Sequence, residues 1–282
     1  MLNVFAVYKE TRRNKTQSDA MHLRIGNTVI TNKTNAKTNA KENTYEIKND
    51  VCPHLIKSVA AISGSSRGSS SSGSGSSSSS SSSSKSFEAR TVMPLKEYLK
   101  RCNHATELYV ALCLLRDLGR QMQALLSGGH GIACFSVDDV VIIAHRESDA
   151  FTHSDPESTL GPDPQFLFLN DRLIFEVDES DGTLLIDRAL NANAKTAFVA
   201  PELAAKQEQE QERVHFKTAY HSAAQLLIYF LLGKSDPSLE QGLNGTSLNL
   251  NLNLNPIKGT KLYWFLLRCL NRVPSERSYV YV

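Results

Sequence analysis

The chain has 282 residues, of which 41% are hydrophobic, and its 31 Lys and Arg residues nearly balance 29 Asp and Glu residues, for a net charge of +2. This composition is typical of one globular domain or two small ones, and it provides no basic face for nucleic acid. The five cysteines are scattered without the spacing of a zinc site or a disulfide framework. No apolar run reaches the ~20 residues of a membrane span, and the N-terminal order, a brief apolar run followed by basic residues, is the reverse of that in a signal peptide. We therefore expect an intracellular protein with reduced thiols.

Composition divides the chain into two blocks joined by a tract that is nearly all Ser and Gly. This tract, residues 63–86, has too few apolar side chains to offset the entropy of ordering, so we expect a disordered linker or loop. The first block, residues 1–62, is polar, whereas the second, residues 87–282, has clear helical patterns. Two further low-complexity segments, at 207–212 and 246–255, are expected to be insertions in surface loops.

The second block predicts helices and short strands in a definite order. The expected helices lie at 92–101, 106–126, 218–232 and 260–270. The expected strands lie at 140–144 and 166–169, and a hairpin is expected at 172–187 around Asp181-Gly182. The buried face of the helix at 106–126 is expected to contain Leu108, Leu112, Leu115, Met122 and Leu126. We therefore predict an α+β fold in which helices predominate.

Three segments of this block carry motifs in a fixed order. Residues 198–203 read Phe-Val-Ala-Pro-Glu-Leu, residues 217–232 form a continuous apolar helix, and residues 267–277 contain a Cys-Leu…Pro…Arg pattern. The set resembles the large lobe of protein kinases, in which Ala-Pro-Glu closes the activation segment. The resemblance covers about residues 92–282 and implies an ion pair between Glu202 and Arg277. An Arg fork can hold a carboxylate in an apolar lobe through two hydrogen bonds.

Upstream the resemblance is thinner. Residues 45–48, Tyr-Glu-Ile-Lys, are similar to the family's Val-Ala-Ile-Lys, which implies that Lys48 contacts phosphates; an ordinary solvated lysine is the alternative reading. Residues 53–57 resemble the segment that follows the small-lobe helix, which leaves no room after Lys48 for that helix and its paired glutamate. Gly26 is isolated, so no Gly-rich loop is present. We expect a small lobe that is reduced or remodelled, with residues 87–99 as its last strand and the hinge.

The residues needed for phosphoryl transfer are not recognisable. The family's His-Arg-Asp aligns with Cys134-Phe135-Ser136, and a serine cannot act as a carboxylate base at neutral pH. Weak candidates for catalysis or metal binding are Asp138 and Asp139 in the next loop and Asp171 after the second strand. The alternative is that Asp138-Asp139 caps a strand and that Asp171 belongs to an ordinary turn. In the central helix, Ala219 aligns with the aspartate that braces the family's catalytic loop, so no brace is expected.

The resemblance therefore implies a kinase-like domain that has lost catalysis and binds or scaffolds a protein partner. One alternative is a divergent Ser/Thr kinase, which would need ATP and Mg²⁺ as cofactors. A second alternative is an unrelated helical interaction domain. No partner on a membrane or a nucleic acid is expected, and the sequence defines neither a metal site nor the oligomeric state.

Overall fold

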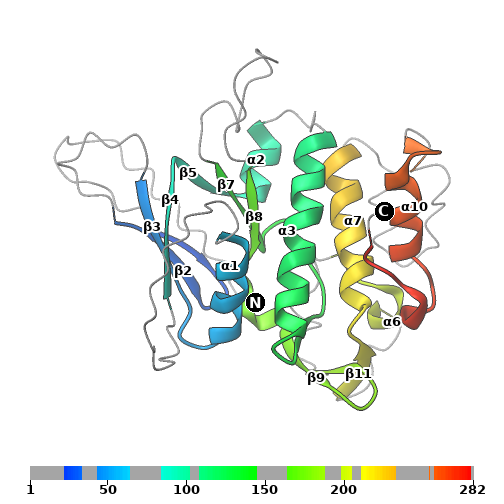
Figure 1. Cartoon of the computed structure of the whole chain (residues 1–282). Coiled ribbons are helices and arrows are strands. Elements are labelled where there is room, and N and C mark those ends of the chain that lie inside the picture. The colour runs from blue at the N-terminus through cyan, green and yellow to red at the C-terminus, as the bar shows by residue number, and fades with distance from the viewer. Residues whose placement is uncertain are drawn as a thin grey trace, which may run out of the picture.

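The computed structural model describes residues 22–33, 43–63, 84–101, 108–144, 164–187, 198–204, 211–232, 254 and 257–280. Within these residues the fold is mixed α+β, with three antiparallel sheets (Figure 1). Two of the sheets lie on one side of the helices at 108–126, 218–232 and 261–269, and the third lies below them (Figure 1). Most of the Ser/Gly tract and of the two low-complexity segments lies outside the described residues. Two strands nevertheless begin within these segments: one begins at Ser84 in the Ser/Gly tract, and the other begins at Gln211 in the segment 207–212. No helix in the described ranges is long and apolar enough to cross a bilayer.

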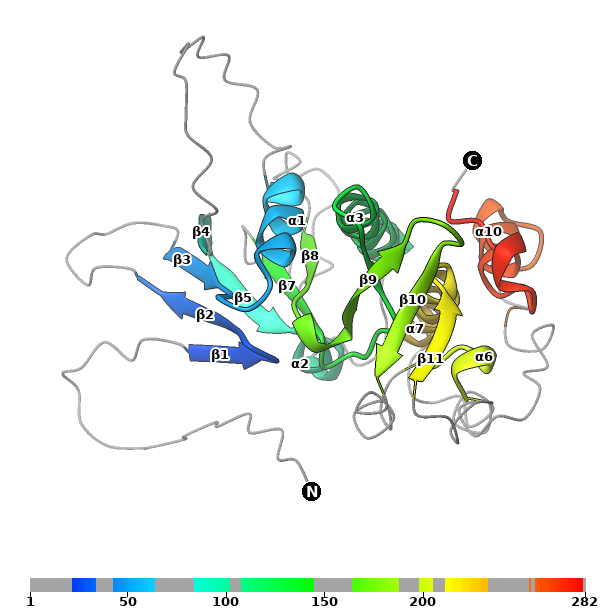
Figure 2. The ribbon, with the colours of Figure 1, turned by 90° about the horizontal axis from the view of Figure 1, so that it is seen from below.

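The first sheet belongs to the N-terminal part of the chain. Its strands have the order β1-β2-β3-β4 and are β1 (His22–Ile25), β2 (Thr28–Asn32), β3 (Asn43–Lys48) and β4 (Ser84–Ala89). Helix α1 (Pro53–Ser63) connects β3 to the tract before β4 and covers one face of the sheet (Figure 2). Because side chains alternate along a strand, Tyr45 and Ile47 lie in the core, while Thr44 and Lys48 on either side of them are exposed.

A short central sheet separates two hydrophobic cores. Its strands have the order β5-β7-β8 and are β5 (Thr91–Pro94), β7 (Val140–Ala144) and β8 (Gln165–Phe168). In β7, Val140 and Ile142 face the larger core, whereas Val141 and Ile143 face the core beneath the first sheet. Burial of both faces explains why this strand is apolar at every position instead of alternating with polar residues.

The third sheet lies at the edge of the molecule below the helices (Figure 1). Its order is β11-β10-β9-β6, and its strands are β6 (His130–Ile132), β9 (Ile174–Asp178), β10 (Thr183–Asp187) and β11 (Gln211–His215). The expected hairpin is present as β9 and β10, and Gly182 in its turn has a φ of 68°. Such a left-handed conformation favours glycine.

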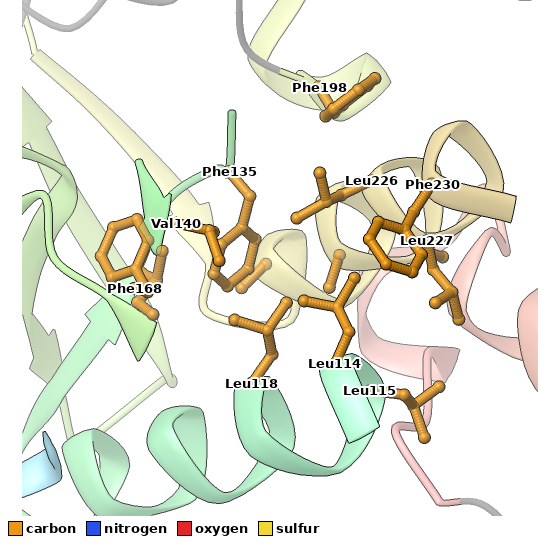
Figure 3. Close-up of a cluster of buried hydrophobic side chains, with 14 of the residues drawn as sticks. Leu114, Leu115, Leu118, Phe135, Val140, Phe168, Phe198, Leu226, Leu227 and Phe230 are labelled. Carbon is orange, nitrogen blue, oxygen red and sulfur yellow. The ribbon is translucent and has the colours of Figure 1, made fainter. Parts of the chain in front are cut away.

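The helices form the larger core. They are α2 (Leu95–Arg101), α3 (Leu108–Leu126), α6 (Pro201–Ala204), α7 (Thr218–Leu232) and α10 (Lys261–Cys269). Side chains of α3 and α7 interdigitate around Phe135 and Phe230, as Figure 3 shows. The expected helix at 92–101 is wrong in its first residues, because Val92 and Met93 pair with β7 as part of β5.

The buried face of α3 also differs from the expected one. Leu115 and Met122 are buried, but Leu108 is 53% exposed, and the polar Asp117 and Gln121 are fully buried. Gln121 donates from Nε2 to the Phe168 carbonyl and accepts at Oε1 from the Phe168 N–H, each at 2.8 Å. These polar side chains therefore satisfy backbone groups at the free edge of β8, which a hydrophobic pattern does not reveal.

Candidate functional site

The segment aligned with a catalytic loop, residues 133–139, crosses the interior between β6 and β7. Cys134, Phe135 and Ser136 are all buried, and none carries a carboxylate. The Phe135 carbonyl accepts a hydrogen bond from the Phe198 N–H at 2.9 Å, and the Phe135 ring lies against α3 and α7 (Figure 3). Burial raises the pKa of the Cys134 thiol to about 12, so this cysteine is not a nucleophile at neutral pH.

This loop has a brace that the sequence did not predict. The Phe135 N–H donates to the hydroxyl Oγ of Ser222, on α7, at 2.7 Å, and both groups are buried. The expectation based on Ala219 is therefore wrong: the central helix does brace the loop, one turn later and through a serine. This hydrogen bond holds the loop against α7 even though positions 134–136 carry no carboxylate.

Asp138 and Asp139 are adjacent but have different environments. Asp138 is half-buried and pairs with Lys96 of α2, with an N–O distance of 3.0 Å. Asp139 is only 6% exposed and accepts a hydrogen bond from Asn170 Nδ2 at 2.7 Å. Burial raises the pKa of Asp139 to about 7, although hydrogen bonds from the Asn170 side chain and the Ser136 backbone act to lower this pKa. Asp139 therefore carries a proton for part of the time near neutral pH.

Asp171 begins the short 3-10 helix η2 (Asp171–Leu173) and is held by the opposite sheet. Its Oδ1 accepts from the Asn27 backbone N–H and its Oδ2 accepts from Asn27 Nδ2, both at 2.9 Å. Asn27 lies in the turn between β1 and β2, beside Gly26. The hairpin turn therefore closes onto this carboxylate.

Further hydrogen bonds extend this contact into the first sheet. Thr28 donates from Oγ1 to the Leu169 carbonyl at 2.7 Å, and Asn49 donates from Nδ2 to Thr28 Oγ1 at 2.8 Å. Asn49 Oδ1 in turn accepts from the N–H groups of Val51 and Cys52, at the start of α1. We call Asn27, Thr28, Asn49 and Asp171 the hairpin clasp. It joins the β1–β2 turn and the α1 start to the loop after β8.

Gly26 is required for this approach. Its φ is 59°, and a Cβ at this position would lie 2.5 Å from Asp171 Oδ1 and 2.9 Å from Asn170 Oδ1. Any side chain there would displace the carboxylate or the turn. The sequence singled out Gly26 only as an isolated glycine, because its role depends on a residue far along the chain.

Lys48 is at the end of β3, with an exposed side chain. A helix does follow it, contrary to expectation: α1 begins at Pro53, and residues 53–57 are its first turn and a half. Helix α1 has no acidic residue in its sequence PHLIKSVAAIS, so it offers Lys48 no glutamate. Lys48 therefore has no glutamate partner on the helix that follows it.

Glu202 and Arg277 meet at the base of the helical part. Arg277 is fully buried and donates from both terminal nitrogens to the two Glu202 carboxylate oxygens, Nη2 to Oε2 at 2.8 Å. Arg277 Nε donates to the Asn271 carbonyl at 2.7 Å, and the Thr218 hydroxyl donates to Glu202 Oε1 at 2.8 Å. Burial opposes ionisation of Glu202, but Arg277 outweighs it, and the net result is a lowered pKa.

The described residues contain no group of three or more His, Cys, Asp or Glu side chains arranged to hold a metal ion. The two best-placed carboxylates, Asp139 and Asp171, instead accept hydrogen bonds from Asn170 and Asn27. These two carboxylates therefore connect segments of the chain that are distant in sequence. No protein-family model matches the chain, and no curated protein matches it significantly.

Proposed function

We propose that this chain is a protein kinase-like module that has lost phosphoryl transfer and acts by binding a protein partner inside the cell. The order of elements supports a kinase-like arrangement. An N-terminal antiparallel sheet with one helix between its third and fourth strands precedes a helical part, in which a buried loop, a strand pair and an Ala-Pro-Glu segment follow one another. The bidentate Glu202–Arg277 pair supports it further. Cys52, Cys113, Cys134 and Cys269 are free thiols, which supports a reducing compartment.

The hairpin clasp is the observation that carries the proposed loss of activity. In protein kinases an aspartate after the strand pair holds Mg²⁺, and a Gly-rich loop covers the phosphates. Here Asp171 follows the strand pair, but both of its oxygens already accept hydrogen bonds from Asn27 of the opposing turn. A metal ion at Asp171 would compete with two charge-assisted hydrogen bonds for the same carboxylate.

The remaining catalytic parts are also missing or misplaced. Positions 134–136 provide no carboxylate base, and α1 provides no glutamate for Lys48. Since phosphoryl transfer depends almost entirely on positioning and charge, the loss of several of these groups together supports a binding role.

Thermal unfolding with and without Mg-ATP tests this proposal. We expect no change in Tm for the wild-type chain at millimolar nucleotide. Ligand at 100 times its Kd would add about 2.7 kcal/mol to the unfolding free energy and would be seen easily as a higher Tm. A rise of several degrees that disappears in Lys48→Ala would overturn the proposal, and Lys57→Ala, at an exposed lysine of α1, is the matched control.

One observation favours the divergent Ser/Thr kinase as a second candidate. Asp139 has a pKa of about 7, which suits a general base at neutral pH. Its burial and its bond to Asn170 keep it away from solvent. Transfer of labelled phosphate to mixed Ser/Thr peptides, abolished by Asp139→Asn, would establish this candidate, whereas its absence supports the binding module.

A further inference from the structure

One face of α10 is exposed and carries an unusual combination of side chains. The helix buries Leu262, Tyr263, Phe265, Leu266 and Cys269. The exposed positions are Lys261, Trp264 and Arg268, whose spacing of three and four residues places them on one face. We call these three residues the α10 face. Trp264 is 58% exposed, and it is the single tryptophan of the chain.

Within residues 257–280, the charged side chains on and beside α10 are positive except for Glu276. The sequence of α10, KLYWFLLRC, has no acidic residue, and the exposed Lys258 and Arg272 lie just before and after the helix. Within residues 257–280 the one acidic side chain is Glu276, which accepts a hydrogen bond from Asn271 Nδ2. Arg277 is neutralised by Glu202 and does not reach the surface. The α10 face is therefore cationic with an aromatic centre.

The backbone that presents this face is firmly held. The Thr260 hydroxyl caps α10 by accepting from the Tyr263 N–H at 3.2 Å, and the buried Tyr263 ring lies edge-on to Trp264, with centroids 5.3 Å apart. Arg268 Nη2 donates to the Val280 carbonyl at 2.7 Å, which places the C-terminal segment beside the last turn of the helix. Val280 and Val273 are themselves 55% and 46% exposed, and they add apolar area near the end of α10.

We propose that the α10 face docks an acidic peptide segment that carries an apolar or aromatic anchor residue. Trp and Arg are the residues most enriched among interface positions that dominate binding energy. A patch of one sign selects a partner of the opposite sign and accelerates the encounter. Trp264 would contact the anchor residue, while Lys261 and Arg268, one turn to either side, would pair with acidic residues. This inference rests on the proposed function, because it supplies the surface that a binding module needs.

The geometry favours a peptide over an anionic membrane. A helix that lies on a membrane inserts a broad apolar face into the lipid, but the broad apolar face of α10 is buried in the core. On α10 itself the exposed apolar group is a single indole between two cations. This pattern suits the recognition of one side chain flanked by carboxylates.

The test uses a fluorescein-labelled peptide, Glu-Glu-Phe-Glu-Glu-Phe-Glu-Glu, titrated with the full chain at low salt and followed by anisotropy. We expect saturable binding that weakens as salt increases, together with a blue shift of the emission of Trp264, which is the chain's one indole. Trp264→Ala and Lys261→Glu should each weaken binding at least tenfold. Leu185→Ala and Lys57→Glu, exposed residues on β10 and α1, should change it less than twofold.

Three results would overturn the inference: no saturable binding by the wild-type chain, equal binding by Trp264→Ala, or equal binding of a peptide with Lys in place of Glu. Two other assays would overturn it in favour of another anionic partner if the peptide does not bind. One is co-sedimentation with phosphatidylserine vesicles, and the other is binding to a duplex oligonucleotide that Trp264→Ala abolishes. All measurements omit nucleotide. A Tm shift with Mg-ATP would therefore overturn the proposed function without changing the peptide result. A failure of the peptide to bind would overturn this inference without changing the result with Mg-ATP.

Discussion

Asn27 binds Asp171 through both its backbone N–H and its side-chain amide, across 144 residues of sequence. The contact joins the β1–β2 turn to the loop that follows β8, so one carboxylate closes the N-terminal sheet onto the rest of the chain. A carboxylate that accepts two hydrogen bonds in a half-buried setting is a firm anchor, because bonds to charged groups contribute more than neutral ones.

Asn27→Ala should therefore destabilise the fold. The variant removes the side-chain donor to Asp171 Oδ2 and leaves the backbone donor in place. Since a hydrogen bond to a charged group contributes about 1.5–3 kcal/mol, we expect a decrease of about 1–3 kcal/mol in the unfolding free energy, measured by urea denaturation. His22→Ala, at an exposed position of β1, is the control and should change stability by less than about 0.5 kcal/mol. Equal effects of the two substitutions would show that the clasp does not contribute.

Gly26→Ala should break the clasp sterically. Gly26 has a φ of 59° and stands against Asp171, whereas Gly129 has a φ of 74° and open space around it. Both substitutions incur the cost of a left-handed alanine, about 1–2 kcal/mol. Only Gly26→Ala adds a clash with the carboxylate, so its unfolding free energy should fall further than that of Gly129→Ala. A difference of zero between the two variants would contradict the close approach seen here.

Local patterns predicted several helices and strands of the second block but missed β6 and β11, and β11 begins inside the segment 207–212 that was expected to be a loop insertion. The apolar run at 140–144, the hairpin around Gly182 and the apolar helix at 218–232 each follow from a few neighbouring residues, and each lies where expected. The sequence of α1 is compatible with a helix, although the motif resemblance predicted none there. Pro53 is well suited to the first turn of a helix, and the following residues through Ala61 tolerate helix.

The functional contacts could not be predicted because they depend on distant partners. The polar Asp117 and Gln121 lie on the buried face of α3 only because the edge of β8 needs donors and acceptors. Ser222 braces Phe135 from a helix that the sequence marked only by its apolar character. Gly26-Asn27 is a recognised two-residue hairpin turn, but nothing in the sequence indicates that Asn27 contacts Asp171.

The Glu202–Arg277 pair should be strongly coupled. Removing one member leaves the other charge buried, which typically costs about 3–5 kcal/mol, so Glu202→Ala and Arg277→Ala should each be strongly destabilising. In the double variant the two losses should not add, and the coupling energy measures the pair. Arg213→Ala, which breaks the exposed contacts to Asp178 and Asp181 at 3.3 Å, is the control and should cost under about 1 kcal/mol. Strict additivity would remove the main support for the kinase-like arrangement and favour an unrelated helical domain.

His221 should make the fold sensitive to acid. Its side chain is buried in α7, its Nδ1 has no hydrogen-bond partner, and burial followed by the charge of Arg277 lowers its pKa to about 4. Because the unfolded chain takes up this proton near pH 6.5, stability present above that pH should be lost as the pH falls towards 4, by about 3 kcal/mol. His221→Leu removes this pH dependence, because leucine takes up no proton. The unfolding free energy of the wild type minus that of the variant should therefore decrease as the pH falls over the same interval. A constant difference would show that His221 does not titrate as a buried neutral group.

Asp139 should produce the opposite pH dependence. Its pKa rises from 3.8 to about 7 on folding, chiefly through burial, so the folded chain retains a proton that the unfolded chain releases. The associated stability is fully present below pH 3.8 and is lost as the pH rises towards 7, on the order of 3–4 kcal/mol. Asp139→Asn keeps an oxygen for Asn170 Nδ2 and cannot ionise, so its stability relative to wild type should increase from pH 4 to pH 7. The unfolding free energy of both proteins is measured by urea denaturation at each pH. The other titrating groups are the same in both proteins, so their contributions cancel in the difference between the two values. A difference that stays flat, or that grows towards acid, would mean that Asp139 is ionised in the folded chain and that Asn170 holds a carboxylate.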